Sequence, residues 1–453
     1  MPLNSATLGS NIPRILGLGK RGENYTHSHI KKASSCNLSL HHKSPNTLPT
    51  HIAFVSKFDQ SFSSPVMEED NKMFGLVSES EEYCKELDVA VRTIQMACFL
   101  FQKVQDTLIS KSGNNNHNPL TLAGWSVKAI VSWILCECLG GENVSIVTEK
   151  EFQTLSKPNT SELLEVVVKT VNECLAEAPR FGVGEPKSAL GTSEVLEIIS
   201  RCNLVGGPSG RFWALSPVDG AMGSARGDQC AVALSLIEDG EVVLGVLGYS
   251  NYPMRKDWLS YHHSYLRMIS KLTPTTSETW NEGCVIYAKR GSGKAWIQPL
   301  LHVNKKFVWQ NNAKQVSISS IDNVALATFC HPIEKNNSSH SFSEGLAQSV
   351  GLSNKPLRVY NMMKYAAIAC GDAEVFMKFE RAGYKEKIWD HAAGVIIIQE
   401  AGGKVTDVRG HPLDFSKGLY LERVDRGIVA CAGATLHEKI IDAFDASWAS
   451  SCL

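Results

Sequence analysis

The chain has 453 residues, of which 43% are hydrophobic and 20% are charged, and its formal net charge at pH 7 is -1. This is the composition of a globular protein long enough for two domains. No basic cluster is interleaved with aromatic side chains, which excludes a nucleic-acid polymer as the expected partner. The longest apolar run near the middle, 129–139, is interrupted by Glu137 and is too short to cross a bilayer, so no membrane partner is expected either.

The first fifty residues hold six Lys or Arg against one acidic residue, Glu23, with many Ser and Thr and no long apolar run. This pattern is typical of an organelle transit peptide, since a secretory signal needs an apolar segment. We therefore expect a transit peptide and linker over 1–77 and delivery to the mitochondrion or chloroplast. The alternative is a disordered tail. The thirteen cysteines lack paired metal-ligand spacing and are interpreted as reduced core thiols of a non-secreted protein.

Apolar side chains recur at three- and four-residue spacing over 82–110, which predicts a long helix with one buried face. The buried positions are Leu87, Val91, Ile94, Cys98, Phe101 and Leu108. A second helix is expected to begin near Trp125, with Gly124 as its N-cap. A strand over 144–147 then delivers Glu149 at its end. Helices follow over 161–178 and 193–202.

The stretch 211–229 is the most informative part of the chain. An apolar strand over 212–215 runs into Pro217, then into the turn Asp219-Gly220, and then into small residues that would let a helix begin. A carboxylate at a strand end can hold a cation, while the backbone amides of a helix N-terminus can hold an anion, and this combination suits phosphate chemistry. The alternative is a plain hairpin turn, because Asp-Gly between apolar runs is a common turn signal.

Later residues predict two domains. Strands over 231–237, 242–247, 284–288 and 295–297 form hairpins, and the segment 290–294 is interpreted as a hairpin turn because it lacks the spacing of a phosphate loop. The first domain, 78–314, is therefore α+β with an antiparallel sheet. Strands over 324–329 and 357–360 alternate with helices over 343–351 and 393–401, which predicts a smaller α/β domain over 315–453. Asp390 is placed to cap the last of these helices.

Several motifs resemble the inositol monophosphatase superfamily and its 3'(2'),5'-bisphosphate nucleotidase branch. They are Pro217-Val-Asp-Gly220, Gly227-Asp-Gln229, Tyr384-Lys-Glu-Lys-Ile-Trp389 and Trp389-Asp-His-Ala-Ala-Gly394, and the similarity extends from about Glu82 to the C-terminus. The resemblance implies a layered α/β sandwich with the active site between the domains. It also implies Mg²⁺-dependent removal of the 3'-phosphate from 3'-phosphoadenosine 5'-phosphate (PAP), a by-product of sulfotransfer, by a monomer whose partner is a small phosphorylated nucleotide.

The resemblance assigns roles residue by residue. Glu149, Asp219, Asp390 and the carbonyl of Val218 would ligate Mg²⁺. Gly220, Ala221, His340, Asn361, Lys364 and Lys378 would contact the nucleotide.

Three positions depart from the family pattern where the chemistry would occur. Gly124 and Ser216 stand where the family has Asp, and Ala221 stands where it has Thr. By resemblance, the Asp at 216 would bridge two metals, and the Asp at 124 would orient and deprotonate the attacking water together with the Thr at 221. Asn361 also takes the place of a family Ser, and Lys150 that of a second Glu. We expect a protein that binds a phosphorylated nucleotide but turns it over poorly or not at all. The alternatives are a working phosphatase in which other groups fill the gaps, a non-catalytic binder that senses or buffers the nucleotide, an inert copy, and an inositol phosphate phosphatase.

Overall fold

The computed structural model describes residues 82–110, 119–140, 144–149, 155, 160–220, 230–250, 283–301, 313–332, 340–354, 356–359, 362–379, 384–422 and 427–451. All of them belong to one compact unit, Lys72–Leu453. The expected transit peptide and linker, 1–77, lie outside these residues and stay a prediction.

A seven-stranded sheet forms the first half of this unit, with its strands neighbouring one another in chain order. The strands are β1 (Ile146–Val147), β2 (Arg211–Asp219), β3 (Ala231–Glu238), β4 (Glu241–Tyr249), β5 (Cys284–Lys289), β6 (Ala295–Pro299) and β7 (Lys314–Val316). Every neighbouring pair is antiparallel except β1 and β2. The expected hairpins are therefore present. The turn between β3 and β4 uses Asp239 and Gly240 at φ +49° and +79°, the left-handed region that two-residue hairpin turns require.

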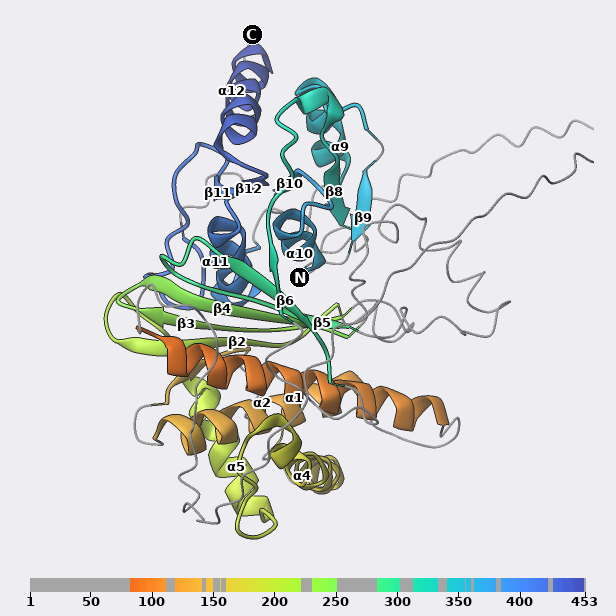
Figure 1. Cartoon of the computed structure of the whole chain (residues 1–453), viewed down its shortest axis with the longest axis vertical. Helices are drawn as coiled ribbons and strands as arrows, with labels where there is room; N and C mark the ends of the chain where they lie inside the picture. The colour runs from red at the N-terminus through yellow and green to blue at the C-terminus, as the bar shows by residue number, and fades with distance from the viewer. Residues whose placement is uncertain are drawn as a thin grey trace, which may run out of the picture. The chain divides into compact units, whose positions relative to one another are not determined.

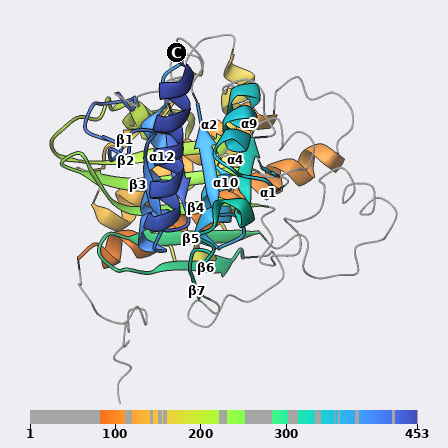
Figure 2. The same ribbon diagram turned by 90° about the horizontal axis from the view of Figure 1, so that it is seen from above.

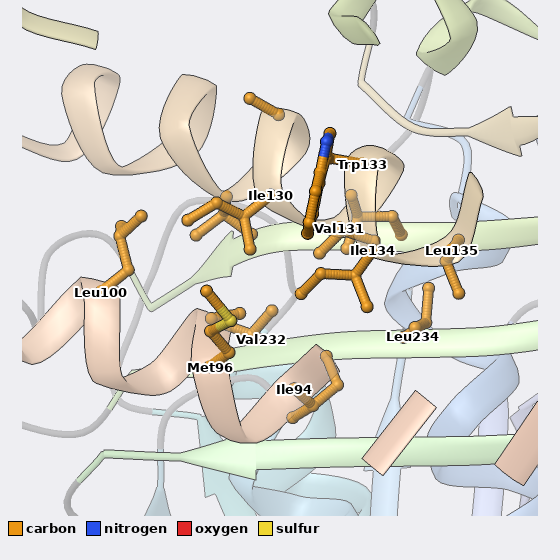
Figure 3. Close-up of a cluster of buried hydrophobic side chains, with 14 of the residues drawn as sticks. Ile94, Met96, Leu100, Ile130, Val131, Trp133, Ile134, Leu135, Val232 and Leu234 are labelled. Atoms are coloured by element: carbon orange, nitrogen blue, oxygen red, sulfur yellow. The ribbon is translucent and has the colours of Figure 1, made fainter. Parts of the chain in front are cut away.

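Helices cover one face of this sheet (Figure 1). They are α1 (Cys84–Ser110), α2 (Pro119–Leu139), α4 (Ser161–Leu175) and α5 (Thr192–Ser200). Figure 3 shows Ile94 and Met96 of α1 and Ile134 of α2 facing Val232 and Leu234 of β3. The predicted amphipathic helices thus bury the faces that their spacing indicated.

The expected start of the second helix near Trp125 is wrong. Helix α2 begins at Pro119, because proline suits the first turn of a helix, and Gly124 lies inside it. In the described part of the chain, the stretch 120–139 is the one helix long and apolar enough to cross a membrane. Of its apolar window, 61% is buried inside the molecule, where it packs against α1, α4, α5 and β2.

The second half of the unit contains a mixed five-stranded sheet with the order β11-β12-β10-β8-β9. Its strands are β8 (Phe329–Pro332), β9 (Leu357–Val359), β10 (Val375–Lys378), β11 (Lys404–Asp407) and β12 (Ile428–Cys431). Helices α10 (Met363–Ala369) and α11 (Ala392–Glu400) share a core with both sheets. Helices α9 (His340–Ser349) and α12 (Ala434–Ser451) lie in contact on the outer face (Figure 2). The fold class predicted from the sequence, α/β, is confirmed.

The strand predicted over 324–329 is wrong for most of its length. Val324–Leu326 is one turn of 3-10 helix, and the strand begins only at Phe329. The side chain of Asn323 explains the turn, since it accepts a hydrogen bond from the backbone N–H of Ala325 at 3.0 Å. Strands β10 and β12 were not predicted, although they lie at the centre of the sheet.

The hairpin turn predicted over 290–294 is present, and its backbone amides bind a carboxylate of the chain itself. The N–H groups of Gly291 and Gly293 donate to Glu400 at 2.8 and 2.6 Å, and the hydroxyl of Ser292 donates at 3.1 Å. This anion-binding turn therefore fastens the end of α11 to the first sheet.

The cysteines behave as core thiols. All eleven that the structure describes are free, and seven of them are buried. Burial raises the pKa of the Cys98 thiol well above its usual value, so such groups stay protonated and pack as small hydrophobic side chains.

The contact between α10 and α11 depends on the absence of a side chain at Gly394. A Cβ there would lie 2.1 Å from Cγ of Tyr365, which is fully buried. We expect Gly394→Ala to lower the free energy of unfolding by about 2 kcal/mol through overpacking. The control is Gly345→Ala in α9, where a Cβ would meet nothing within 4 Å. Equal urea-unfolding midpoints for the two variants would contradict this prediction.

Candidate functional site

A β-bulge near the end of β2 shapes the site. Ser216 pairs with Ala233 and Asp219 pairs with Ala231, so β2 uses one residue more than β3 over this interval. Pro217 lies inside the bulge, one of the few places in a sheet where the missing N–H of proline is tolerated.

The bulge places Ser216 and Asp219 on the same face of the sheet. In a regular strand, residues three apart point to opposite faces. Here Val218 packs into the core under α1 and α2. The cross-strand partners of Ser216 and Asp219, Ala233 and Ala231, both belong to the core shared with α10 and α11. The inserted residue thus turns the Asp219 carboxylate toward the same helices that Ser216 faces.

Asp390 approaches this face from a 3-10 turn, Ile388–Asp390, that contacts β2. The hydroxyl of Ser216, which is 3% exposed, donates to Asp390 Oδ1 at 3.4 Å. Burial, followed by the charge of Asp219, raises the pKa of Asp390 to about 7. Two carboxyl groups within electrostatic reach of each other favour a cation between them or a proton on one of them.

The sequence suggested that Asp390 caps the following helix, and this prediction is wrong. The N-cap of α11 is His391, and no side chain makes the capping hydrogen bond. The carboxylate of Asp219 binds a backbone amide. Its Oδ2 accepts a hydrogen bond at 2.8 Å from the N–H of Met362, the residue just before α10. Gly220, directly after β2, has φ +79°, which favours glycine at this turn.

Two buried lysines lie behind these carboxylates. Lys364 of α10 and Lys378 of β10 are each 4% exposed. Burial, followed by the charge of Lys378, lowers the pKa of Lys364 to about 7, while the charges of Glu386, Asp219 and Asp390 oppose this shift. An anion bound near Lys364 would stabilise its protonated form. The structure therefore brings together Asp219, Asp390, Lys364 and Lys378, four residues to which the sequence gave roles.

A hydrogen-bond network holds Lys378. Its ammonium donates to Glu386 Oε2 at 2.7 Å, and His391 Nε2 shares the same oxygen at 2.7 Å. His391 Nδ1 lies 2.5 Å from the hydroxyl of Tyr365. Glu386 and His391 are both fully buried. This network fixes Lys378 and the segment that carries Asp390.

Glu149 follows β1, as predicted, but its carboxylate is paired with a lysine. The ammonium of Lys387 donates to Glu149 Oε1 at 2.9 Å, with the two side chains 26% and 51% exposed. Lys128 of α2, which is 4% exposed, donates to the backbone carbonyl of Glu149 at 2.9 Å. Two cations therefore lie against the one residue that the sequence suggested as the first metal ligand.

The donor set does not fit a magnesium site built from three carboxylates. Mg²⁺ requires hard oxygen ligands in octahedral geometry. Within the ranges that the structure describes, no three His, Cys, Asp or Glu side chains are grouped so that they could share a metal ion. The carboxylate of Glu149 binds Lys387, and Ser216 offers Asp390 a neutral hydroxyl.

Gly124 lies in α2, which contacts β2. A Cβ at Gly124 would meet nothing within 4 Å, so the position has room for a carboxylate. Lys128 follows one turn later on the same face of the helix.

Other predicted residues lie outside the description. Ala221, Lys150 and Asn361 fall in segments that the structure does not describe, and of His340 only the backbone position at the start of α9 is given. Sequence reasoning also overlooked three residues of the site, Lys128, Glu386 and Lys387. The signal available was Lys128 four residues after Gly124, together with the charged run before Trp389.

Comparisons with known proteins relate the chain to a family of phosphatases. The model of the inositol monophosphatase family matches residues 117–449. The chain is 52% identical over 373 residues to "3',5'-bisphosphate nucleotidase AHL" of Arabidopsis thaliana, covering 81% of this chain and 98% of that protein. It is 38% identical over 322 residues to "3'(2'),5'-bisphosphate nucleotidase 1" of the same plant, covering 71% and 84% of the two chains. The structure of Mycobacterium tuberculosis SuhB aligns with 81% of this chain and 98% of its own, at 14% identity and a TM-score of 0.46.

Proposed function

The chain belongs to the inositol monophosphatase family, and on this premise we propose that it binds a small nucleotide phosphorylated at both the 3' and the 5' position, such as PAP. We propose further that it hydrolyses this nucleotide slowly or not at all. The observation that carries the proposal is the group that the buried Lys364 and Lys378 form with the half-buried carboxylates of Asp219 and Asp390. The names of the relatives, bisphosphate nucleotidases, support the substrate class and the family reaction.

Binding and catalysis need different parts of the site. Binding a phosphate needs fixed positive charge and hydrogen-bond donors, and buried lysines supply both. Phosphoryl transfer also needs the developing charge neutralised and a water oriented for attack, for which this family uses Mg²⁺ and carboxylates. The substitutions at Gly124 and Ser216 affect the second set, whereas the resemblance gives position 221 both a catalytic role and a contact with the nucleotide. These three substitutions are the reason for proposing an impaired reaction.

The alternatives have distinct consequences. A working phosphatase would release phosphate from PAP at an ordinary rate, and an inert copy would neither bind nor hydrolyse it. An inositol phosphate phosphatase would prefer a phosphorylated cyclic polyol without a base.

We expect calorimetry of the full chain to give a dissociation constant for PAP on the order of 10 μM. Lys364→Met should weaken binding about tenfold, because it removes a cation from the phosphate site while conserving the volume of the side chain. Lys385→Met is the matched control, since this exposed lysine lies 3.9 Å from Glu422. Absence of PAP binding would refute the proposal, and tighter binding of inositol monophosphate would favour an inositol phosphate phosphatase.

The N-terminal composition supports delivery to the mitochondrion or chloroplast. We also propose a domain boundary near Lys314, in β7, after which the chain enters the five-stranded sheet. We further propose that the protein is a monomer.

A further inference from the structure

Lys387 occupies an unusual electrostatic position in this site. Its ammonium donates to Glu149 Oε1 at 2.9 Å, and it lies within electrostatic reach of Asp390, three residues later. The ring centroid of Trp389 lies 5.6 Å from the same nitrogen. The lysine therefore pairs with the carboxylate of Glu149, two residues after β1, and lies within electrostatic reach of the carboxylate of Asp390.

Lys128 strengthens this arrangement from the other side of Glu149. Its buried ammonium binds the Glu149 carbonyl at 2.9 Å and lies 4.6 Å from the ring centroid of Trp125. A buried ammonium is strongly disfavoured unless it has partners of this kind. The backbone that presents Glu149 is thus held by one cation, and its carboxylate by another.

We infer that this chain takes up the phosphate groups of its ligand without a divalent cation, because Lys387 already supplies a positive charge to Glu149 and lies within electrostatic reach of Asp390, two of the carboxylates that would hold a metal. The inference rests on the proposed function, since it concerns the same site and ligand. The lysines of the site would contact the phosphate oxygens directly, as point charges.

The missing carboxylates explain why a lysine ammonium, and not a divalent metal ion, is the cation at this site. Lys387 belongs to the segment Tyr384-Lys-Glu-Lys-Ile-Trp389, which the chain shares with the nucleotidase branch it resembles, so the lysine itself is not the departure. The departure is Gly124 and Ser216. With a neutral hydroxyl at Ser216 in place of a metal-binding carboxylate, and less negative charge at Gly124, a divalent ion gains too few oxygen ligands to offset its loss of water. An ammonium needs only one or two.

An ordinary surface ion pair would not behave in this way. Exposed ion pairs contribute little to stability. Replacing one residue of such a pair, away from the ligand, leaves the affinity for the ligand unchanged. Lys387 differs because it also lies within electrostatic reach of Asp390, at the predicted ligand site. Its removal should therefore change affinity for the ligand rather than stability alone.

The experiment is a calorimetric titration of the full chain with PAP, once in EDTA and once with Mg²⁺, for the natural chain, Lys387→Met and Lys385→Met. We expect equal affinity of the natural chain in both buffers, a loss of about tenfold for Lys387→Met in EDTA, and no change for Lys385→Met. Lys385 is a fitting control because it is two residues away and carries the same charge.

A second series uses Gly124→Asp with Ser216→Asp, which should make PAP affinity depend on Mg²⁺.

Three other results of these titrations would contradict different parts of the proposal. Binding that requires Mg²⁺ in the natural chain would overturn the inference and leave the proposed function standing. No binding in either buffer would refute the proposed function itself. Equal affinities of Lys387→Met and Lys385→Met, with the fold of both verified by circular dichroism, would overturn the role of Lys387.

Discussion

A chain carrying Gly124→Asp, Ser216→Asp and Ala221→Thr is expected to release phosphate from PAP about a thousandfold faster than the natural chain when Mg²⁺ is present, which corresponds to about 4 kcal/mol of transition-state stabilisation. The change restores the side chains that the family uses at these three positions. Their effects should not add, because bridging a metal and orienting a water depend on each other.

The structure gives physical grounds for this gain at two of the positions. A Cβ at Gly124 meets nothing within 4 Å, so the new carboxylate has room. An Asp at 216 would face Asp390, whose Oδ1 already lies 3.4 Å from the Ser216 hydroxyl. Two facing carboxylates repel each other unless a cation lies between them. Mg²⁺ should therefore compete successfully with Lys387 in the altered chain.

Phosphate release measured over a range of Mg²⁺ concentrations tests this prediction. The control replaces Ser216→Asp with Ser216→Asn, which has the same shape without the charge and should recover little of the rate. The melting temperature adds an independent measurement, since Mg²⁺ should raise it in the restored chain and leave it unchanged in the natural one. If the natural chain already releases phosphate within about tenfold of the restored chain, the missing carboxylates are not needed and the protein is an ordinary nucleotidase.

Loss of the Glu386 side chain should have the largest effect on stability. Glu386→Ala removes the shared partner of Lys378 and His391 and leaves the Lys378 ammonium buried, with 5% of its side chain exposed. Breaking a buried ion pair on one side costs roughly 3 to 5 kcal/mol of unfolding free energy. Urea unfolding followed by circular dichroism measures the change.

Two further variants serve as controls for Glu386→Ala. Glu386→Gln keeps an acceptor oxygen and should lose about half as much. Glu422→Ala removes the exposed partner of Lys385, 3.9 Å away, and should change stability by less than about 1 kcal/mol. If Glu386→Ala and Glu422→Ala unfold at the same urea concentration, the buried network does not support the fold.

The same network predicts sensitivity to acid. Burial raises the pKa of Glu386, but the hydrogen bond from His391 and the charge of Lys378 outweigh it and lower the pKa to about 2. Because this value lies below the ordinary pKa of Glu, the stabilisation is complete above about pH 4.5 and is lost as the pH falls toward 2.

The sequence by itself determined the class of fold and the chemical identity of much of the site. The spacing of apolar residues in α1 and α4 placed their buried faces correctly, because helical periodicity is a local property. The resemblance to a known family pointed to Asp219, Asp390, Lys364 and Lys378 as candidate site residues, and the substitutions at Gly124 and Ser216 could be read directly. Local signals failed where a short side chain changed the backbone, as Asn323 did ahead of the turn Val324–Leu326.

Only the tertiary structure decided which of these groups face one another. The bulge at Pro217 turns Asp219 to the side of Ser216, although their spacing in a regular strand would separate them. The pairing of Glu149 with Lys387 joins residues 238 positions apart in the chain, and no local pattern specifies such a contact. Electrostatic interactions depend on distance and burial, which arise only when the two sheets and the helices between them are packed together.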